Sequence, residues 1–173
     1  MERKMNKKVL IAYASKHGST AEIAKKIEED LNQSGFECTT LPAKQVKDLS
    51  GFHAIVLGTG LYMGQWQKEA VKFIKQNKAN LVNQNVWIFT SGPTGEGDPV
   101  KLVQDRLFPE GLRATIDEIN PKDITVFHGN IVLSKLNGFE KWIINKVNAA
   151  IGDFRNWQSI STWATGIANS LNS

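Results

Sequence analysis

A short polar turn, Ser15–Thr20, holds the residues best suited to bind a ligand. The apolar run before it, Val9–Ala14, predicts a buried strand, and a helical stripe follows it: Ile23, Ala24, Ile27 and Leu31. The first backbone N–H groups of such a helix have no internal partner, and the helix macrodipole adds positive charge there. Gly18 and three hydroxyl side chains complete a predicted cradle for a phosphate group. An N-cap without a ligand is the alternative on local chemistry alone.

Two motifs that are absent from this turn restrict the class of phosphate-containing ligand that it could bind. It does not end in Gly-Lys-Ser or Gly-Lys-Thr, which argues against a nucleoside triphosphate. It is also not a Gly-x-Gly-x-x-Gly fingerprint, which argues against a dinucleotide. Hydroxyl and amide donors without an obligatory lysine or metal ligand suit a phosphate monoester.

Two glycine-containing loops are further candidates for the same site. Gly58–Gly64 and Ser91–Gly97 each follow an apolar segment that predicts a strand. Glycine permits a flat ligand to approach the backbone closely, and Leu61 and Tyr62 are candidates to contact it. Trp66 lies further along, where we expect it to pack on the adjacent helix. Because ligands of open α/β sheets bind at the carboxyl ends of the strands, these loops and the polar turn are predicted to meet.

The elements that position these loops follow from the apolar pattern. Five segments predict strands: Val9–Ala14, Phe36–Leu41, Ala54–Leu57, Asn85–Thr90 and Ile124–Phe127, the last continuing at Ile131–Leu133. Helical segments separate them, and no consecutive hairpins are expected, so the sheet is predicted to be parallel with right-handed crossovers. A helix is expected from Asp98 to Leu107, an irregular segment over Phe108–Pro121, and a last helix with Ile160 and Leu171 on its apolar face.

Length and composition indicate one domain over residues 1–173, with residues 1–7 as a flexible basic tail. The net charge of +4 is mild, and we expect no nucleic-acid partner. Cys38 is the only cysteine, so no internal disulfide can form, which fits a reducing cytoplasm. No signal peptide or membrane span is predicted. The expected location is cytoplasmic. At most, we expect peripheral contact with the inner face of the membrane.

Several other chemistries are not supported by the sequence. The three histidines, His17, His53 and His128, are scattered and have no metal-ligand spacing, so no metal site is predicted. No Gly-x-Ser-x-Gly motif is present, so no nucleophile elbow is expected. We therefore predict no catalytic acid, base or nucleophile from the chain itself.

The stretch Tyr13–Thr20, with Ala24 and Ile27 at the expected spacing, resembles the phosphate-binding signature of the flavodoxin family. Ala12 departs from that signature, which has a larger apolar residue there. The resemblance implies an α/β flavodoxin-like three-layer sandwich with a five-stranded parallel sheet in the order 2-1-3-4-5. It also implies FMN as cofactor, bound by Ser15, Lys16, His17, Gly18, Ser19, Thr20, Gly60, Leu61, Tyr62, Met63, Gly64, Ser91, Gly92, Pro93, Thr94 and Gly95.

The C-terminal third resembles one branch of that family, the FMN-dependent protoporphyrinogen dehydrogenases. An extra amphipathic helix is expected over Leu136–Ile151, and the basic balance differs from the acidic surfaces of typical flavodoxins. This branch implies electron transfer from a porphyrinogen through FMN to a quinone. The apolar stripe Phe139–Ile151 is expected to pack in the core, and contact with a quinone or membrane is the alternative.

Three functions are therefore compatible with the sequence. The first is an FMN-dependent oxidoreductase that acts on a small-molecule substrate, a porphyrinogen, with a quinone as acceptor. The second is an electron carrier that docks on protein redox partners. The third is a flavin-free interaction domain.

Overall fold

The structure of this chain, a computed structural model, describes residues 6–173. Of the predicted basic tail over residues 1–7, the first five residues lie outside the described part.

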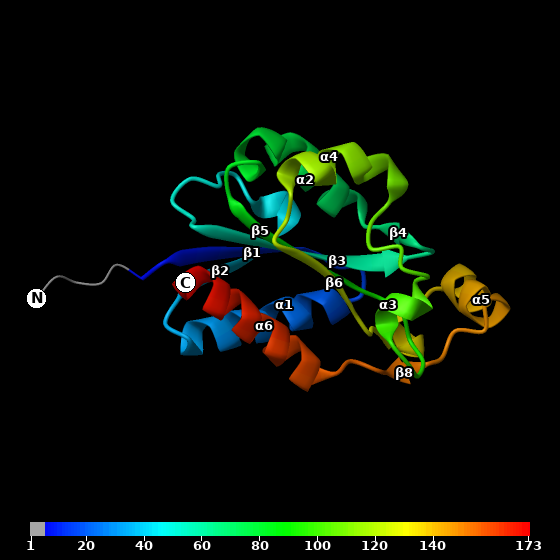
Figure 1. The fold of residues 1–173 in the computed structure, drawn as a ribbon. Coiled ribbons are helices and arrows are strands. Elements are labelled where there is room, and N and C mark those ends of the chain that lie inside the picture. The colour runs from blue at the N-terminus through cyan, green and yellow to red at the C-terminus, as the bar shows by residue number, and fades with distance from the viewer. Residues whose placement is uncertain (1–5) are drawn as a thin grey trace, which may run out of the picture.

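A parallel sheet of five strands forms the centre, in the order β2-β1-β3-β5-β6 (Figure 1). The strands are β1 (Lys8–Ala14), β2 (Glu37–Pro42), β3 (Ala54–Tyr62), β5 (Asn85–Ser91) and β6 (Asp123–Phe127). Numbered along the chain, these five strands have the order 2-1-3-4-5, so the predicted topology is confirmed.

The central strand β1 is buried on both faces because its side chains alternate between two cores. Val9 and Ile11 pack in one core, and Leu10, Ala12 and Ala14 pack in the other. All of these except Ala14 have no exposed surface, and Ala14 is 5% exposed. This arrangement explains the unbroken apolar run in the sequence.

Helices cover both faces of the sheet and complete the three layers (Figure 1). Helices α1 (Ser19–Gln33) and α6 (Trp157–Asn172) pack on one face, and α2 (Lys68–Leu81) and α4 (Arg113–Ile119) pack on the other. The predicted apolar stripes of the first and last helices are buried in the core.

The segment expected to be irregular, Phe108–Pro121, instead contains α4, so that prediction was wrong. Ile116 and Ile119 of this short helix are each 3% exposed and pack against the sheet. The helix expected over Asp98–Leu107 is much shorter. Helix α3 (Pro99–Leu102) begins with Asp98 as N-cap, but Gln104 and Asp105 adopt positive φ angles, which end the helical path.

Strand β3 is longer than predicted, because its ladder with β5 continues to Gly60. Its end then pairs with β4 (Gln65–Trp66) in an antiparallel hairpin, which the sequence analysis did not expect. Met63 and Gly64 form the turn, with φ angles of 52° and 74°. Trp66 is 4% exposed and belongs to the core, as expected.

The predicted continuation of the fifth strand at Ile131–Leu133 was wrong. Residues Asn130–Ile131 form β7, which pairs antiparallel with β8 (Gly152–Asp153) in a separate two-stranded ribbon. Between these strands lies an excursion that contains α5 (Gly138–Lys146). The 3-10 helices are η1 (Ala43–Gln45), η2 (Glu110–Leu112) and η3 (Leu133–Lys135).

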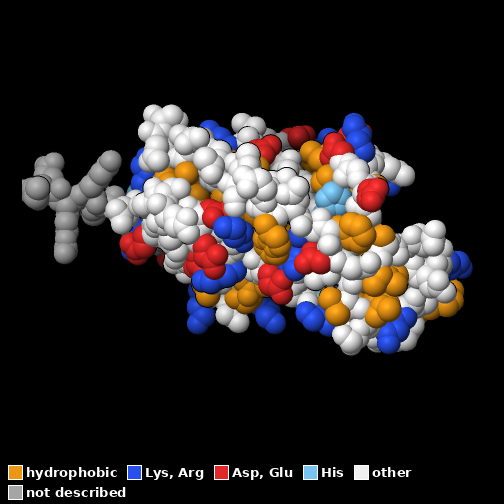
Figure 2. Space-filling model, turned by 90° about the horizontal axis from the view of Figure 1, so that it is seen from below, with side chains coloured by type: hydrophobic (Ala, Val, Ile, Leu, Met, Phe, Trp, Pro, Cys, Tyr) orange, Lys and Arg blue, Asp and Glu red, His pale blue; other side chains and the backbone are white. Residues whose placement is uncertain are grey.

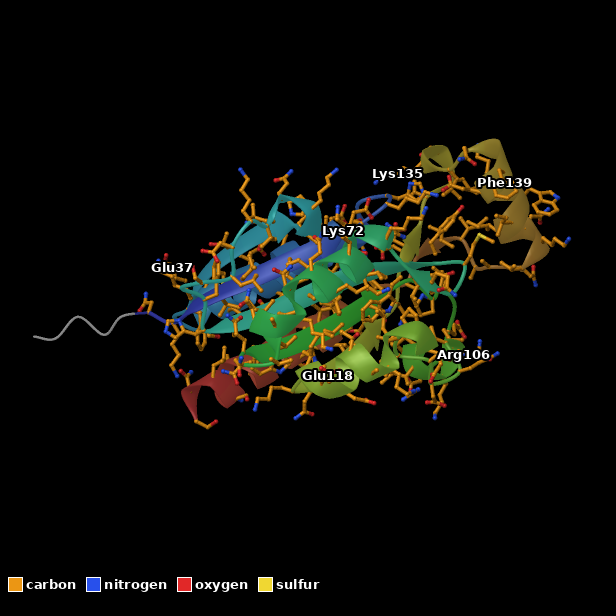
Figure 3. All side chains as sticks on the ribbon, turned by 90° about the horizontal axis from the view of Figure 1, so that it is seen from above. Glu37, Lys72, Arg106, Glu118, Lys135 and Phe139 are labelled. Carbon is orange, nitrogen blue, oxygen red and sulfur yellow. The ribbon has the colours of Figure 1, made fainter. Side chains whose placement is uncertain are left out.

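Helix α5 is shorter than the helix predicted over Leu136–Ile151, and it lies on a lobe at one end of the sheet. Figure 3 shows Lys135 and Phe139 on this lobe, opposite the end that carries Glu37. None of its residues belongs to either core cluster of the described residues, so the expected core packing of Phe139–Ile151 was wrong. Among residues 6–173, no helix combines the length and apolar content required to cross a membrane.

Candidate functional site

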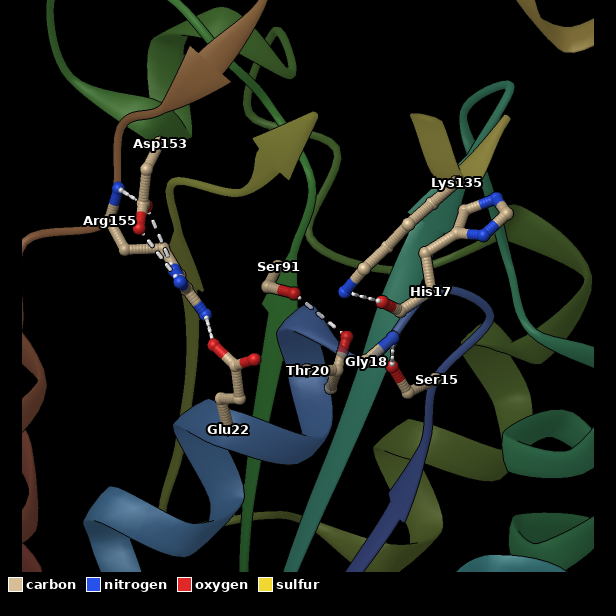
Figure 4. A network of polar contacts seen from close by, with 9 residues as sticks. All are labelled: Ser15, His17, Gly18, Thr20, Glu22, Ser91, Lys135, Asp153 and Arg155. Carbon is tan, nitrogen blue, oxygen red and sulfur yellow. Dashed lines mark hydrogen bonds and ion pairs between the residues drawn. The ribbon is translucent and has the colours of Figure 1, made fainter. Parts of the chain in front are cut away.

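The turn before α1 has the geometry that the sequence predicted. Gly18 adopts a φ of 94°, a left-handed conformation that glycine tolerates best, and its N–H donates to Ser15 Oγ at 3.0 Å (Figure 4). Helix α1 then begins at Ser19. The start of this helix is therefore a compact cradle at the carboxyl end of the central strand.

Two adjacent hydroxyls of this helix have different surroundings. Ser19 Oγ is buried and has no hydrogen-bond partner within residues 6–173. Thr20 is 2% exposed, and its Oγ1 lies 2.9 Å from Ser91 Oγ at the end of β5 (Figure 4). A Cβ atom on Gly60 would lie 3.1 Å from Thr20 Oγ1, so the end of β3 lies close to the same point. The polar turn and the ends of both strands are thus packed together.

A cavity of about 480 Å³ lies at this edge of the sheet. It is lined by residues of the predicted turn and of both predicted loops: Ser15, Lys16, His17, Ser19, Thr20, Gly60, Leu61, Tyr62, Met63, Ser91 and Gly92. The structure therefore brings together the three segments that the sequence predicts to form one site.

Five predicted site residues do not line this cavity. Gly18 shapes the backbone of the turn, and Gly64 lies beside a second cavity near Trp66. Pro93, Thr94 and Gly95 belong to a loop that packs on the segment after β6, where Gly129 N donates to the carbonyl oxygen of Pro93 at 2.9 Å. The Gly92 N–H donates to the carbonyl oxygen of Phe127.

Other lining residues were not predicted as part of the site. They come from α1, the β4–α2 connection and above all the excursion after β6: Glu22, Gln67, Gly129, Asn130, Ile131, Val132, Lys135, Leu136, Glu140, Ile143, Ile144, Val147 and Ala149. The apolar stripe in the segment between β7 and β8 was the only sequence signal for these residues. Its helical spacing does not indicate whether the stripe faces the core, a cavity or solvent. Helix α5 and its flanks form one wall of the cavity.

Glu140 links this wall to the polar turn. It is 3% exposed, and its Oε1 lies 2.5 Å from Lys16 Nζ and 3.0 Å from His17 Nε2. Its Oε2 accepts the backbone N–H of Asn137, while its own N–H donates to Asn137 Oδ1, which forms a capping box at the start of α5. One buried carboxylate therefore takes part in the helix cap and binds two residues of the predicted phosphate cradle.

The ion pair shifts the ionisation of both partners. Hydrogen bonds from Lys16 first, and then from the Asn137 backbone and His17, lower the pKa of Glu140 to about 2. The same carboxylate raises the pKa of Lys16. Lys16 Nζ also lies 3.7 Å from the centroid of the Tyr62 ring, so it connects the wall with the β3 loop.

The base of the excursion is held by a second polar cluster. Arg155, with a side chain 6% exposed, donates to Asp153 at 2.7 Å and to Glu22 of α1 (Figure 4). Lys135 Nζ donates to the carbonyl oxygen of His17 at 3.2 Å. Polar contacts to α1 and to the turn before it thus anchor both the β7–β8 ribbon and the segment that contains α5.

The fold and site define a flavodoxin-like α/β protein with a polar turn at a helix start beside a mixed polar and apolar cavity. The sequence matches the family model described as flavodoxin domain over residues 10–156. The chain therefore belongs to the flavodoxin domain family, whose members bind FMN. The residues present fit this cofactor, because the buried Ser19 hydroxyl lacks a partner where a phosphate would lie and the adjoining walls suit a ring. No curated protein matches the sequence.

Solved structures with the same fold have little sequence identity with this chain. A flavodoxin from the domain Archaea has a TM-score of 0.65 and 13% identity, with 96% of this chain and 99% of that chain covered. The Streptococcus pneumonia TIGR4 flavodoxin has a TM-score of 0.59 and 15% identity, with 94% and 99% covered. Rubredoxin oxygen:oxidoreductase from Desulfovibrio gigas has a TM-score of 0.61 and 16% identity, with 95% of this chain but 36% of that chain covered.

Proposed function

We propose that this protein is an FMN-dependent oxidoreductase that passes electrons from a small organic donor to a quinone. The observation that carries the proposal is the wall of the cavity. Ile143, Ile144 and Val147 of the excursion line the same cavity as the β3 loop, so an apolar surface adjoins the polar turn. A planar apolar acceptor needs such a surface, whereas a protein partner needs an accessible cofactor edge.

Each part of the cavity has a role in this proposal. The Ser15–Thr20 turn binds the cofactor phosphate, and Leu61, Tyr62 and Met63 flank its ring. Helix α5 lines part of the remaining space with apolar side chains. FMN, when bound, supplies the transfer of electrons, and the chain binds, orients and shields it.

The donor that we propose is a porphyrinogen, in line with the resemblance to protoporphyrinogen dehydrogenases. In each cycle the donor loses two electrons and two protons, and the quinone gains both to become a quinol. A flat macrocycle and a quinone both require apolar contact beside the flavin, and the wall formed by α5 provides it.

An electron carrier is the second candidate, because two flavodoxins match almost the whole chain in structure. Carriers usually meet their partners through a large field of one sign, which raises the association rate. This chain has 21 basic and 17 acidic residues, so no strong field is expected unless the charges segregate.

Stopped-flow reoxidation of the reduced, FMN-loaded protein distinguishes the two candidates. We expect a soluble menaquinone analogue to reoxidise the flavin faster than a set of carrier proteins does, with little dependence on salt. Steady-state oxidation of a porphyrinogen with the same quinone then tests the donor. Slow reaction with the quinone, together with fast and strongly salt-dependent transfer to a carrier, would overturn the enzyme proposal in favour of the carrier.

A further inference from the structure

The outer side of the α5 lobe exposes large apolar side chains. Of the nine exposed large hydrophobic residues within 6–173, five lie on this lobe: Leu133, Phe139, Trp142, Val147 and Ile151. Phe139 is 64% and Trp142 55% exposed, and their rings stack with centroids 6.0 Å apart. Val147 also lines the cavity, so we call the other four residues, with Lys141 and Lys146, the lobe surface. Figure 2 shows hydrophobic side chains gathered with basic ones on the projecting lobe.

The charges of the lobe are of one sign on its outside. Between β7 and β8 the sequence contains Lys135, Lys141 and Lys146, and Glu140 is its single acidic residue. Glu140 is buried and paired with Lys16, so it contributes no exposed negative charge. Lys146 Nζ lies 4.7 Å from the centroid of the Trp142 ring, which places a cation beside the exposed aromatic pair.

We propose that the lobe surface docks on an anionic lipid bilayer. Exposed apolar patches of this kind mark interaction surfaces, and aromatic side chains beside lysines are typical of helices that lie in the membrane interface. Lysine ammonium groups bind anionic headgroups while tryptophan and phenylalanine enter the acyl boundary. The basic charge of the lobe favours this occupant over a basic protein or a second copy of the same basic surface.

Docking of the lobe surface on a bilayer would also place the cavity close to the membrane. Helix α5 presents Phe139 and Trp142 to solvent, while its Ile143 and Ile144 line the cavity. A docked lobe would therefore hold the cavity next to the bilayer, where lipid-soluble quinones reside. The docking itself rests on the exposure and charge of the lobe and requires neither FMN nor turnover, so the docking and the proposed function can fail separately.

The test is co-sedimentation of the full-length, FMN-loaded protein with vesicles of phosphatidylcholine alone or mixed with phosphatidylglycerol. We expect binding to the anionic vesicles that weakens as salt is raised, and little binding to the neutral ones. Substituting Lys141→Gln together with Lys146→Gln should weaken binding about thirtyfold. Phe139→Ala with Trp142→Ala should abolish it.

The matched control is Val82→Ala with Leu102→Ala, which removes exposed apolar side chains from other parts of the surface and should leave vesicle binding unchanged. Retention of the flavin spectrum shows that each variant is folded. Absence of wild-type binding to anionic vesicles would overturn the proposal, and so would full binding by the Phe139→Ala and Trp142→Ala variant. A wild-type dimer that this variant dissociates, without vesicle binding, would instead identify the lobe surface as a self-association interface.

Discussion

Ser19 and Thr20 are neighbours in one helical turn, yet the protein uses their hydroxyls differently. Thr20 Oγ1 is hydrogen-bonded to Ser91, whereas buried Ser19 Oγ has no partner in the described chain. A buried hydroxyl without a partner is costly, and a bound phosphate would satisfy it. We therefore propose that the Ser19 hydroxyl binds the phosphate.

Substituting Ser19→Ala should weaken FMN binding about tenfold to a hundredfold, because a hydrogen bond to a charged group contributes about 1.5–3 kcal/mol. Riboflavin, which lacks the phosphate, should bind as it does to the wild type. The thermal midpoint of the free protein should not fall, since the hydroxyl has no protein partner to lose. Fluorescence titration and thermal denaturation measure these effects.

Thr20→Val is the comparison for that variant. It should weaken FMN binding and also destabilise the protein, because it leaves Ser91 Oγ without its partner. If Ser19→Ala weakened riboflavin and FMN equally, the turn would not be the phosphate site.

The buried ion pair of Glu140 leads to a second prediction, which concerns stability and its dependence on pH. Replacement by Gln should destabilise the protein at neutral pH by about 1.5–3 kcal/mol, because the charged partner of Lys16 and His17 is lost. The folded-state pKa of Glu140 is depressed to about 2 from 4.5. Its stabilising contribution is therefore fully present above pH 4.5 and is lost as the pH falls toward 2.

The measurement is thermal denaturation of the wild type and Glu140→Gln across this acidic range. The two midpoints should converge as the pH approaches 2. Glu118→Gln removes an exposed partner of Lys78 and should have little effect at any pH. A difference between wild type and Glu140→Gln that stayed constant down to the lowest pH would show that the charge of Glu140 is not its stabilising feature.

At the scale of elements, buried strands and helices with strong stripes could be predicted from the sequence. Strand β1 has apolar residues on both faces, and α1 has its stripe at helical spacing, so local pattern and burial agree. Helix α4 was missed because seven residues between prolines and polar positions give a weak periodic signal. Helix α4 is buried because it packs on one face of the sheet, and this tertiary contact cannot be read from the local sequence.

The excursion after β6 shows the limit of the pattern more clearly. The apolar stripe of this segment predicted a helix, but it did not predict what the helix contacts. Apolar residues have the same helical spacing whether they face the core, a cavity or solvent. The role of Glu140 depends on contacts with residues more than a hundred positions earlier in the chain. The candidate site could be predicted where it consists of local turns, and not where a distant segment closes it.

The packing of β3 against β5 leads to a prediction at this scale. A Cβ atom on Gly58 would lie 2.2 Å from the Phe89 ring, so Gly58→Ala should cost about 1–3 kcal/mol of stability through overpacking. Gly166 lies in α6 with open space around its Cβ position, and Gly166→Ala should stabilise the helix by about 0.5–1 kcal/mol. Denaturant unfolding of both variants checks the opposite signs. Equal stability of Gly58→Ala and the wild type would contradict the tight β3–β5 packing.

At the scale of the whole molecule, one edge of the sheet concentrates the features that matter for function. The phosphate turn, the β3 loop and the end of β5 meet there, and the α5 lobe forms the remaining wall. The lobe also carries most of the large exposed apolar side chains of residues 6–173. The α5 lobe therefore contributes to both the proposed cofactor site and the proposed docking surface.

We propose that this cavity binds FMN through a single phosphate at the start of α1. The most direct test is titration of the purified, flavin-free protein with FMN, FAD and riboflavin, followed by fluorescence and the visible spectrum. We predict that FMN binds most tightly, because the cradle fits one terminal phosphate and provides no second phosphate site. Tighter binding of FAD, or equal binding of riboflavin and FMN, would contradict the claim.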